Sequence, residues 1–137
     1  MSKLTHLMKD LNDALALQWS AIIQYLQHAA ALSRPDSLSI AEILRSHAEE
    51  EIENANKLGE KIVALGGLPT DRIEPINIAD NWRDMVRQDL EGEQLAISDM
   101  RDIINDYQDD IGLKELMEEL IASKQRQVER LNKLLAA

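Results

Sequence analysis

Hydrophobic residues recur along most of the chain at intervals of three and four positions, which is the spacing of one face of an α-helix. Segments rich in polar residues, Gly or Pro interrupt this pattern near residues 33–37, 66–80 and 109–112. Helices usually end at such segments, because Pro lacks a backbone N–H and Gly is flexible. The pattern predicts four long helices, near Leu4–Leu32, Leu38–Leu65, Asp80–Tyr107 and Leu113–Leu135.

The three connections differ in length, and this difference predicts the topology. The first and third are short, so each joins two antiparallel neighbours. The second runs from Gly66 to Asp80 and has 15 residues. At about 3.3 Å per residue such a segment reaches roughly 50 Å, enough to run the length of a bundle. We therefore predict an all-α four-helix bundle with one long crossover between the second and third helices, in a single domain over residues 1–137.

The inward-facing stripe of each predicted helix is apolar at its two ends and polar near its middle. In helices of similar length the polar turns fall at one level of the bundle, so their side chains should meet in one buried layer. Polar and charged groups are buried only when they are partnered. The expected members of this polar layer are Gln18, Glu51, Asn54, Glu93, Lys124 and Gln127.

Two buried carboxylates, Glu51 and Glu93, require positive charge, and the sequence offers two sources of it. One is a divalent metal ion, for which the residual candidate ligands are Glu51, Glu93, His47 and Gln127. The other is the ammonium of Lys124, which has no lone pair for a metal and repels a cation. The sequence favours Lys124 as an internal counter-ion, in a layer without a metal.

Composition and charge narrow the class of protein. Two Trp, two Tyr and no Phe make a strand-rich fold improbable. The absence of cysteine and of an apolar signal segment predicts a cytoplasmic location, and no apolar run approaches the roughly 20 residues of a membrane helix. The 15 basic and 25 acidic residues leave a formal charge of −10, so we expect neither nucleic acid nor a membrane as a partner.

Several segments resemble the bacterioferritins, a family within the ferritin-like superfamily. Residues 11–15 and 20–29 resemble the first helix of that family, and residues 47–52 (HAEEEI) resemble the second. Residues 65–69 (LGGLP) resemble the start of its crossover, and residues 89–93 (DLEGE) its third helix. The resemblance covers nearly the whole chain and implies a ferritin-like four-helix bundle.

The resemblance also implies which positions correspond to the family's metal ligands. Iron-oxidising members hold two metal ions with four carboxylates and two histidines, and each helical hairpin supplies one lone Glu and one Glu-x-x-His motif. Only Glu51 and Glu93 match that ligand set here. Glu51 stands at one bridging position and Lys124 at the other, so a direct ion pair is expected. The four departures from the set are Gln18, Asn54, Lys124 and Gln127.

Two other departures from the family concern haem and assembly. The family's haem is held between two subunits by a Met that follows the ligand Glu of the second helix, and this chain has Ile52 there. The sequence ends at Ala137, where cage-forming members continue into a fifth helix. We therefore expect no haem ligation by that route and no autonomous cage.

A second apolar strip on the first helix suggests a partner surface. This strip lies beside the core stripe and contains Ala16, Trp19, Ile23, Leu26 and Ala30. A bundle core should not cover both strips, so Trp19 and Ile23 are expected to be exposed in a monomer. The resemblance implies a two-fold dimer along the first two helices, with Trp19, Ile23 and Leu26 at its interface.

Three other side chains are assigned structural roles. Tyr25 follows Ile22 on the core stripe and is expected to be a core tyrosine with a buried partner for its hydroxyl group. His6 and His28 lie outside the stripes, so a solvated or interfacial position without chemistry is expected for both.

These observations predict a non-catalytic protein of iron homeostasis that needs no cofactor. It would be an accessory subunit that co-assembles with active bacterioferritin chains, or an interaction module. The alternative is a residual iron-binding ferroxidase or iron-storage protein that uses the remaining carboxylates, with iron as its metal.

Overall fold

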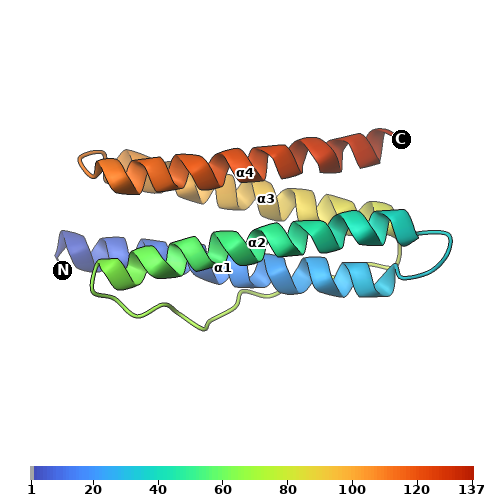
Figure 1. Ribbon diagram of the computed structural model, residues 1–137, viewed down its shortest axis with the longest axis horizontal. Helices are drawn as coiled ribbons and strands as arrows, with labels where there is room; N and C mark the ends of the chain where they lie inside the picture. The colour runs from blue at the N-terminus through green and yellow to red at the C-terminus, as the bar shows by residue number, and fades with distance from the viewer. Residues whose placement is uncertain (1) are drawn as a thin grey trace.

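The computed structural model describes residues 2–137, which form a bundle of four α-helices (Figure 1). The first antiparallel hairpin joins α1 (Lys3–Ala31) to α2 (Leu38–Ala64), and the second joins α3 (Trp82–Asp106) to α4 (Ile111–Ala136). The two hairpins pack with α1 against α3 and α2 against α4. The predicted all-α bundle with one long crossover is confirmed, and each helix boundary lies within two residues of its predicted position.

Side chains at the helix starts explain where three helices begin. Ser2, Asn81 and Asp110 precede α1, α3 and α4, and each accepts a hydrogen bond from the backbone N–H three residues later, at 2.9 to 3.1 Å. These bonds satisfy N–H groups that have no partner within the helix.

Two glycines end α2 and direct the chain into the crossover. Gly67 N–H donates to the carbonyl of Ile62, and Gly66 N–H donates to that of Val63, both at 2.9 Å. This pair of bonds is the Schellman arrangement of a helix C-terminus. It places Gly66 at a φ of 89°, where an L side chain would be strained.

The apolar core has two parts, one toward each end of the bundle. One part contains Leu11, Leu58, Met100 and Leu120, among others. The other is formed by residues such as Leu44, Val86 and Leu131. The polar layer lies between them at mid-length, because all four inward stripes change from apolar to polar there.

The crossover runs along α1 from the end of α2 to the start of α3 (Figure 1). Asn12, Ser20, Gln24 and His28 of α1 hold it through hydrogen bonds of 2.6 to 3.2 Å that end on its backbone atoms. These side chains recur at helical spacing and form a polar ladder, defined here as these four residues. The extended part of the crossover, residues 68–80, has no backbone–backbone hydrogen bonds of its own and satisfies much of its backbone in this way.

The prediction that Trp19 is exposed is wrong, because the crossover covers this part of α1. The indole Nε1–H of Trp19 donates to the backbone carbonyl of Thr70 at 2.8 Å, and the ring packs against the core. Ala16, from the same strip, is fully buried. Ile23 and Leu26 lie beyond the covered part and are 38% and 44% exposed.

Within residues 2–137, no helix combines the length and the apolar character needed to span a lipid bilayer.

Candidate functional site

The polar layer brings together side chains from all four helices in the middle of the bundle. All six of its predicted members are buried, with at most 4% of each residue exposed. They occupy inward positions of their helices, and the apolar residues on both sides exclude water from them. The charged groups of the layer therefore interact in a medium of low dielectric constant, which strengthens the interactions between them.

The ammonium of Lys124 forms an ion pair with Glu51 at the centre of this layer. Lys124 Nζ lies 2.8 Å from Glu51 Oε2 and 4.0 Å from Glu93 Oε2. Gln18 Nε2 also donates to Glu51 Oε2. Burial alone would lower the pKa of Lys124, but the negative charges of Glu93 and Glu51 outweigh it and raise that pKa, so the amine is protonated.

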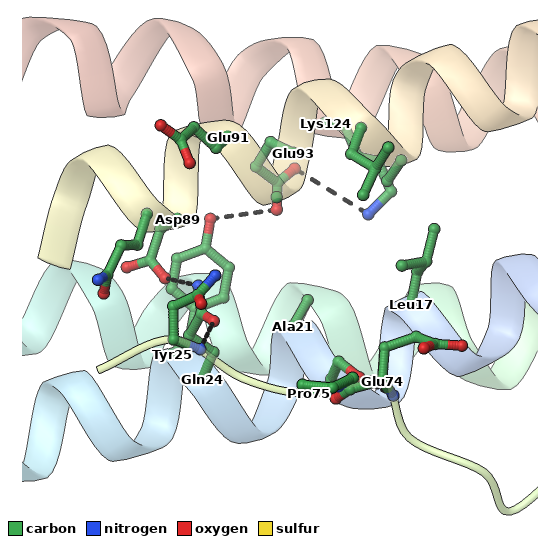
Figure 2. Close-up of a pocket in the computed structure, with 16 residues that line it drawn as sticks. Leu17, Ala21, Gln24, Tyr25, Glu74, Pro75, Asp89, Glu91, Glu93 and Lys124 are labelled. Atoms are coloured by element: carbon green, nitrogen blue, oxygen red, sulfur yellow. Dashed lines mark hydrogen bonds and ion pairs between the residues drawn. The ribbon is translucent and has the colours of Figure 1, made fainter. Parts of the chain in front are cut away.

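Glu93 is held on its other side by Tyr25. The Tyr25 hydroxyl donates to Glu93 Oε1 at 3.1 Å, and Figure 2 shows Glu93 between Tyr25 and Lys124. Burial, together with the charge of Glu51, raises the pKa of Glu93 to about 8 despite the opposing effect of Lys124. Burial also raises the pKa of Tyr25. Tyr25 is therefore a buried, protonated phenol, and the partner of its hydroxyl group is Glu93.

His47 borders the layer as a neutral imidazole with both nitrogens occupied. Its Nε2 accepts a hydrogen bond from Arg130 Nε at 3.0 Å, and its Nδ1 lies 3.3 Å from the Tyr25 hydroxyl. Arg130 also contacts both carboxylate oxygens of Glu50, at 2.8 and 3.0 Å. Burial, and secondarily the charge of Arg130, lowers the pKa of His47 to about 4. The lone pair that could bind a metal is therefore engaged by Arg130.

The other two amide members of the layer, Gln127 and Asn54, make only long hydrogen bonds. Gln127 Nε2 donates to the backbone carbonyl of His47 at 3.5 Å, and Asn54 Nδ2 donates to Ser123 Oγ at 3.3 Å, at the edge of the layer. Four buried oxygens of the layer have no hydrogen-bond partner within residues 2–137; they are Gln18 Oε1, Glu51 Oε1, Glu93 Oε2 and Gln127 Oε1.

The donor set of the layer is poor for a metal ion. Within residues 2–137, no three His, Cys, Asp or Glu side chains converge in a way that could hold one. The residual candidates Glu51, Glu93 and His47 therefore do not form a ligand cluster, and an amide oxygen of Gln127 adds only a neutral donor. The ammonium of Lys124 lies where it repels a cation bound between the two carboxylates.

A second buried cluster, formed by Gln24, His28 and Asp89, lies beside the polar layer. His28 is fully buried, so the expectation that it is solvated or interfacial is wrong. Its Nδ1 lies 3.0 Å from Asp89 Oδ2, and its Nε2 lies 2.9 Å from the backbone carbonyl of Asn77. Gln24 Nε2 donates to the other oxygen of Asp89 at 3.0 Å. Because both ring nitrogens of His28 face acceptors, the ring is an imidazolium.

The charge of His28 follows from this environment. Burial alone would lower the pKa of His28, but the hydrogen bond and the negative charge of Asp89 together raise it. The spacing offered a signal that our sequence reasoning missed: Asp89 lies on the same face of α3 as Glu93, and His28 is three positions after Tyr25. The Asn77 carbonyl, a backbone atom of the crossover, could not be found that way.

A cavity of about 220 Å³ connects the polar layer to the surface between α1, α3 and the crossover (Figure 2). Its buried end contains Tyr25, Glu93 and Lys124. Its outer end is lined by Glu74 of the crossover and Glu91 of α3. The cavity therefore lies beside the buried layer, on the side that faces the crossover.

Comparisons with known proteins agree with the fold and the sequence pattern. The family model of the ferritin-like domain matches residues 8–137. A bacterioferritin from Rhodobacter capsulatus is 30% identical over 123 residues, covering 87% of this chain and 76% of the relative. One from Brucella melitensis is 29% identical with the same coverage.

Two crystal structures match over nearly the whole chain. A ferritin-like, diiron-carboxylate protein from Bacillus anthracis has a TM-score of 0.89 at 29% identity, covering 98% of this chain and 99% of that one. A Rhodobacter capsulatus bacterioferritin with a metal-free dinuclear site and a haem iron has a TM-score of 0.92 at 27% identity, covering 99% of this chain and 87% of that one. The chain therefore belongs to the bacterioferritin family of the ferritin-like superfamily.

Proposed function

We propose that this bacterioferritin-like protein acts in iron homeostasis without oxidising iron itself. In this proposal it is a cytoplasmic accessory subunit that co-assembles with active bacterioferritin chains, or an interaction module. The observation that carries the proposal is the position of Lys124 Nζ, 2.8 Å from Glu51 Oε2 in the buried layer.

Electrostatics supports this proposal. Two unit charges 4 Å apart interact by about 4 kcal/mol at an effective dielectric constant near 20, so a divalent ion at that distance from an ammonium is opposed by about 8 kcal/mol. Glu51 and Glu93 attract such an ion, but Lys124 already offsets one of their charges. His47 adds no free lone pair, because Arg130 occupies it. The residues present do not fit a dinuclear iron centre.

Haem ligation by the family's route finds no support either. Ile52 is 50% exposed on α2, and its side chain has no atom that can ligate iron. We therefore propose that the protein uses no resident cofactor.

The exposed part of the apolar strip supports a homodimer. Ile23 and Leu26 lie one turn apart on α1 and remain exposed where the crossover no longer covers the helix. Trp19 is excluded as a primary contact because the crossover covers it. A surface built on Ile23 and Leu26 also suits co-assembly with a related subunit that presents the same face.

Iron binding and oxidation test the proposal. The parent protein, purified after growth in iron-rich medium, is expected to carry no stoichiometric iron and to leave aerobic ferrous oxidation at the uncatalysed rate. A restored variant, with Gln18→Glu, Asn54→His, Lys124→Glu and Gln127→His, supplies the ligand set of active members and is expected to gain both properties.

A charge-matched control and a contrary outcome complete this test. Lys114→Glu makes the same charge change as Lys124→Glu at an exposed position of α4 and is expected to behave like the parent. Stoichiometric iron bound to Glu51 and Glu93 of the parent would overturn the proposal.

One observation favours the alternative, a residual iron-binding ferroxidase or storage protein. Glu51 Oε1 and Glu93 Oε2 are buried without hydrogen-bond partners, so both carboxylates keep an oxygen that a metal ion could bind if Lys124 lost its proton. This alternative predicts ferrous oxidation by the parent that Glu51→Gln abolishes and that becomes faster in Lys124→Met.

A further inference from the structure

Residues 73–78 of the crossover, called the strap here, form one wall of the cavity beside the polar layer. Glu74, Pro75 and Asn77 line the cavity on this side, and Figure 2 shows Glu74 and Pro75 on the extended chain alongside α1. The strap has no backbone–backbone hydrogen bonds of its own. Of residues 66–80, only Ala79 packs against an apolar core. The strap can therefore detach in a local opening that leaves the four helices packed.

One charged side chain and three neutral ones bond to the backbone of the strap. His28 Nε2 lies 2.9 Å from the carbonyl oxygen of Asn77, and its Nδ1 lies 3.0 Å from Asp89 Oδ2. The three neutral side chains within residues 2–137 are Ser20, Gln24 and Gln88. Only the His28 attachment therefore depends on a proton that is gained or lost near neutral pH.

Loss of this proton reverses the interaction at Asn77. A neutral imidazole carries one N–H, so His28 can then donate to only one of its two partners. The carboxylate of Asp89 is the stronger acceptor because it is charged, and the remaining N–H is expected on Nδ1. The lone pair of Nε2 then faces the lone pairs of the Asn77 carbonyl, and an attraction becomes a repulsion.

Asp89 is the charged group that faces His28. The neutral amide of Gln88 also reaches the ring from α3, and the crossover contributes the Asn77 carbonyl. At this end of the bundle α2 and α4 contribute apolar side chains, which are Ala41, Leu44 and Leu131. Burial alone would lower the pKa of His28, but Asp89 raises it, so the loss of the proton falls above pH 6.5.

We propose that protonated His28 keeps the strap closed over the cavity, and that loss of the proton lets the strap detach near Asn77 and admit solvent. The first part of the crossover stays in place, because Asn12 and Trp19 hold Thr70 through hydrogen bonds without a titratable group. Opening removes one wall of the cavity and leaves the helices in position. This control of access does not require iron in the polar layer, so its failure would leave the proposed function standing.

Hydrogen exchange of single backbone amides, followed by NMR from about pH 6 to about pH 9, tests this opening. The N–H of Asn77 reports the end that should open, and the N–H of Thr70, which donates to Asn12 Oδ1 at 2.8 Å, is the internal control. Protection is expressed relative to the unfolded chain at each pH. It is expected to fall at least about tenfold at Asn77 as a charged hydrogen bond is lost, and to stay constant at Thr70.

Three variants assign the opening to His28. His28→Gln keeps Glu93, whose pKa of about 8 lies in the same range, and is expected to give the same Asn77 protection at every pH. His6→Gln, at an exposed position, is the matched control and should behave like the parent. Ser20→Ala removes a neutral attachment and keeps His28, so Asn77 protection should be lower throughout but still fall with pH.

A thiol probe measures access to the cavity itself, because the chain contains no cysteine. Ala96→Cys places a thiol at a buried position of the cavity wall, and Ser98→Cys places one on the exposed surface of the same helix. The ratio of their labelling rates is expected to rise with pH, and to stay constant when His28→Gln is added to both. The proposal is overturned if Asn77 protection does not change with pH, if Thr70 loses protection equally, or if the change persists in His28→Gln.

Discussion

Lys124 is the one lysine or arginine within residues 2–137 that is fully buried, and its ammonium supplies the positive charge of the polar layer. Its nearest partner is Glu51, which also accepts a hydrogen bond from Gln18. Removing one member of a buried ion pair leaves the other uncompensated, whereas removing both is much less costly. The contribution of Lys124 to stability therefore depends on the residue at position 51.

Replacing Lys124 with methionine is expected to destabilise the fold by about 3 to 5 kcal/mol, because the carboxylate of Glu51 then lacks its counter-ion. The free energy of unfolding in urea measures this loss. Adding Glu51→Gln to Lys124→Met should recover a large part of it, since the amide needs no counter-ion. If the double variant is no more stable than Lys124→Met, the pair does not act as a unit.

At the scale of elements, the long crossover is held in place by side chains of another helix, α1. The polar ladder of α1 holds it, and His28 joins it to α3 through Asp89 and Asn77. Because the imidazolium of His28 donates to both sides, this junction needs two protons on the ring. The attachment of the crossover is therefore sensitive to pH.

Stability is expected to fall as pH rises through the folded-state pKa of His28. That pKa lies above the ordinary value of 6.5, so the folded protein binds the proton more tightly than the unfolded chain does. The stabilisation is complete below about pH 6.5 and is lost as pH rises through the raised pKa. Urea unfolding across this pH window measures the effect.

Two variants isolate this contribution. His28→Gln should remove this part of the pH dependence, whereas His6→Gln, at an exposed position, should keep it. An identical pH dependence in His28→Gln and the parent would contradict the assignment of an imidazolium at position 28.

Two glycine substitutions are expected to have opposite effects on stability. Gly66 ends α2 at a φ of 89°, so Gly66→Ala should destabilise the protein by about 1 kcal/mol. Gly92 lies inside α3 with no atom within 4 Å of an added Cβ, so Gly92→Ala should stabilise by about 0.5 to 1 kcal/mol. Thermal or urea unfolding compares the two. A destabilised Gly92→Ala variant would indicate a contact at the cavity mouth that needs glycine.

At the scale of the whole molecule, the helices and the polar layer were predictable because both follow from positions repeated at three and four residues. Gln18 and Lys124 interrupt otherwise apolar stripes, and that interruption is visible in the sequence. Trp19 and His28 were misplaced for one shared reason. Their partners are the backbone carbonyls of Thr70 and Asn77, separated by 51 and 49 residues, and a carbonyl has no side-chain signature.

The exposed part of the apolar strip predicts the oligomeric state. Sedimentation at micromolar concentration is expected to give twice the chain mass of 15.5 kDa. Replacing both Ile23 and Leu26 with glutamate should give a monomer, because like charges would face one another across a two-fold axis. Ile111→Glu, at a position 72% exposed on α4, is the control and should remain dimeric. A monomeric parent would exclude this dimer.

The hydrogen bonds between α1 and the backbone of the crossover have a consequence for how this protein can evolve. The polar ladder recognises main-chain groups, much as a receptor groove recognises an extended peptide, and leaves outward side chains such as Ile73 and Ile78 free. Mutations at those positions can accumulate without detaching the segment. The outward side chains of the crossover can therefore change during evolution while the interior of the bundle stays the same. New recognition specificities could arise on this outer surface.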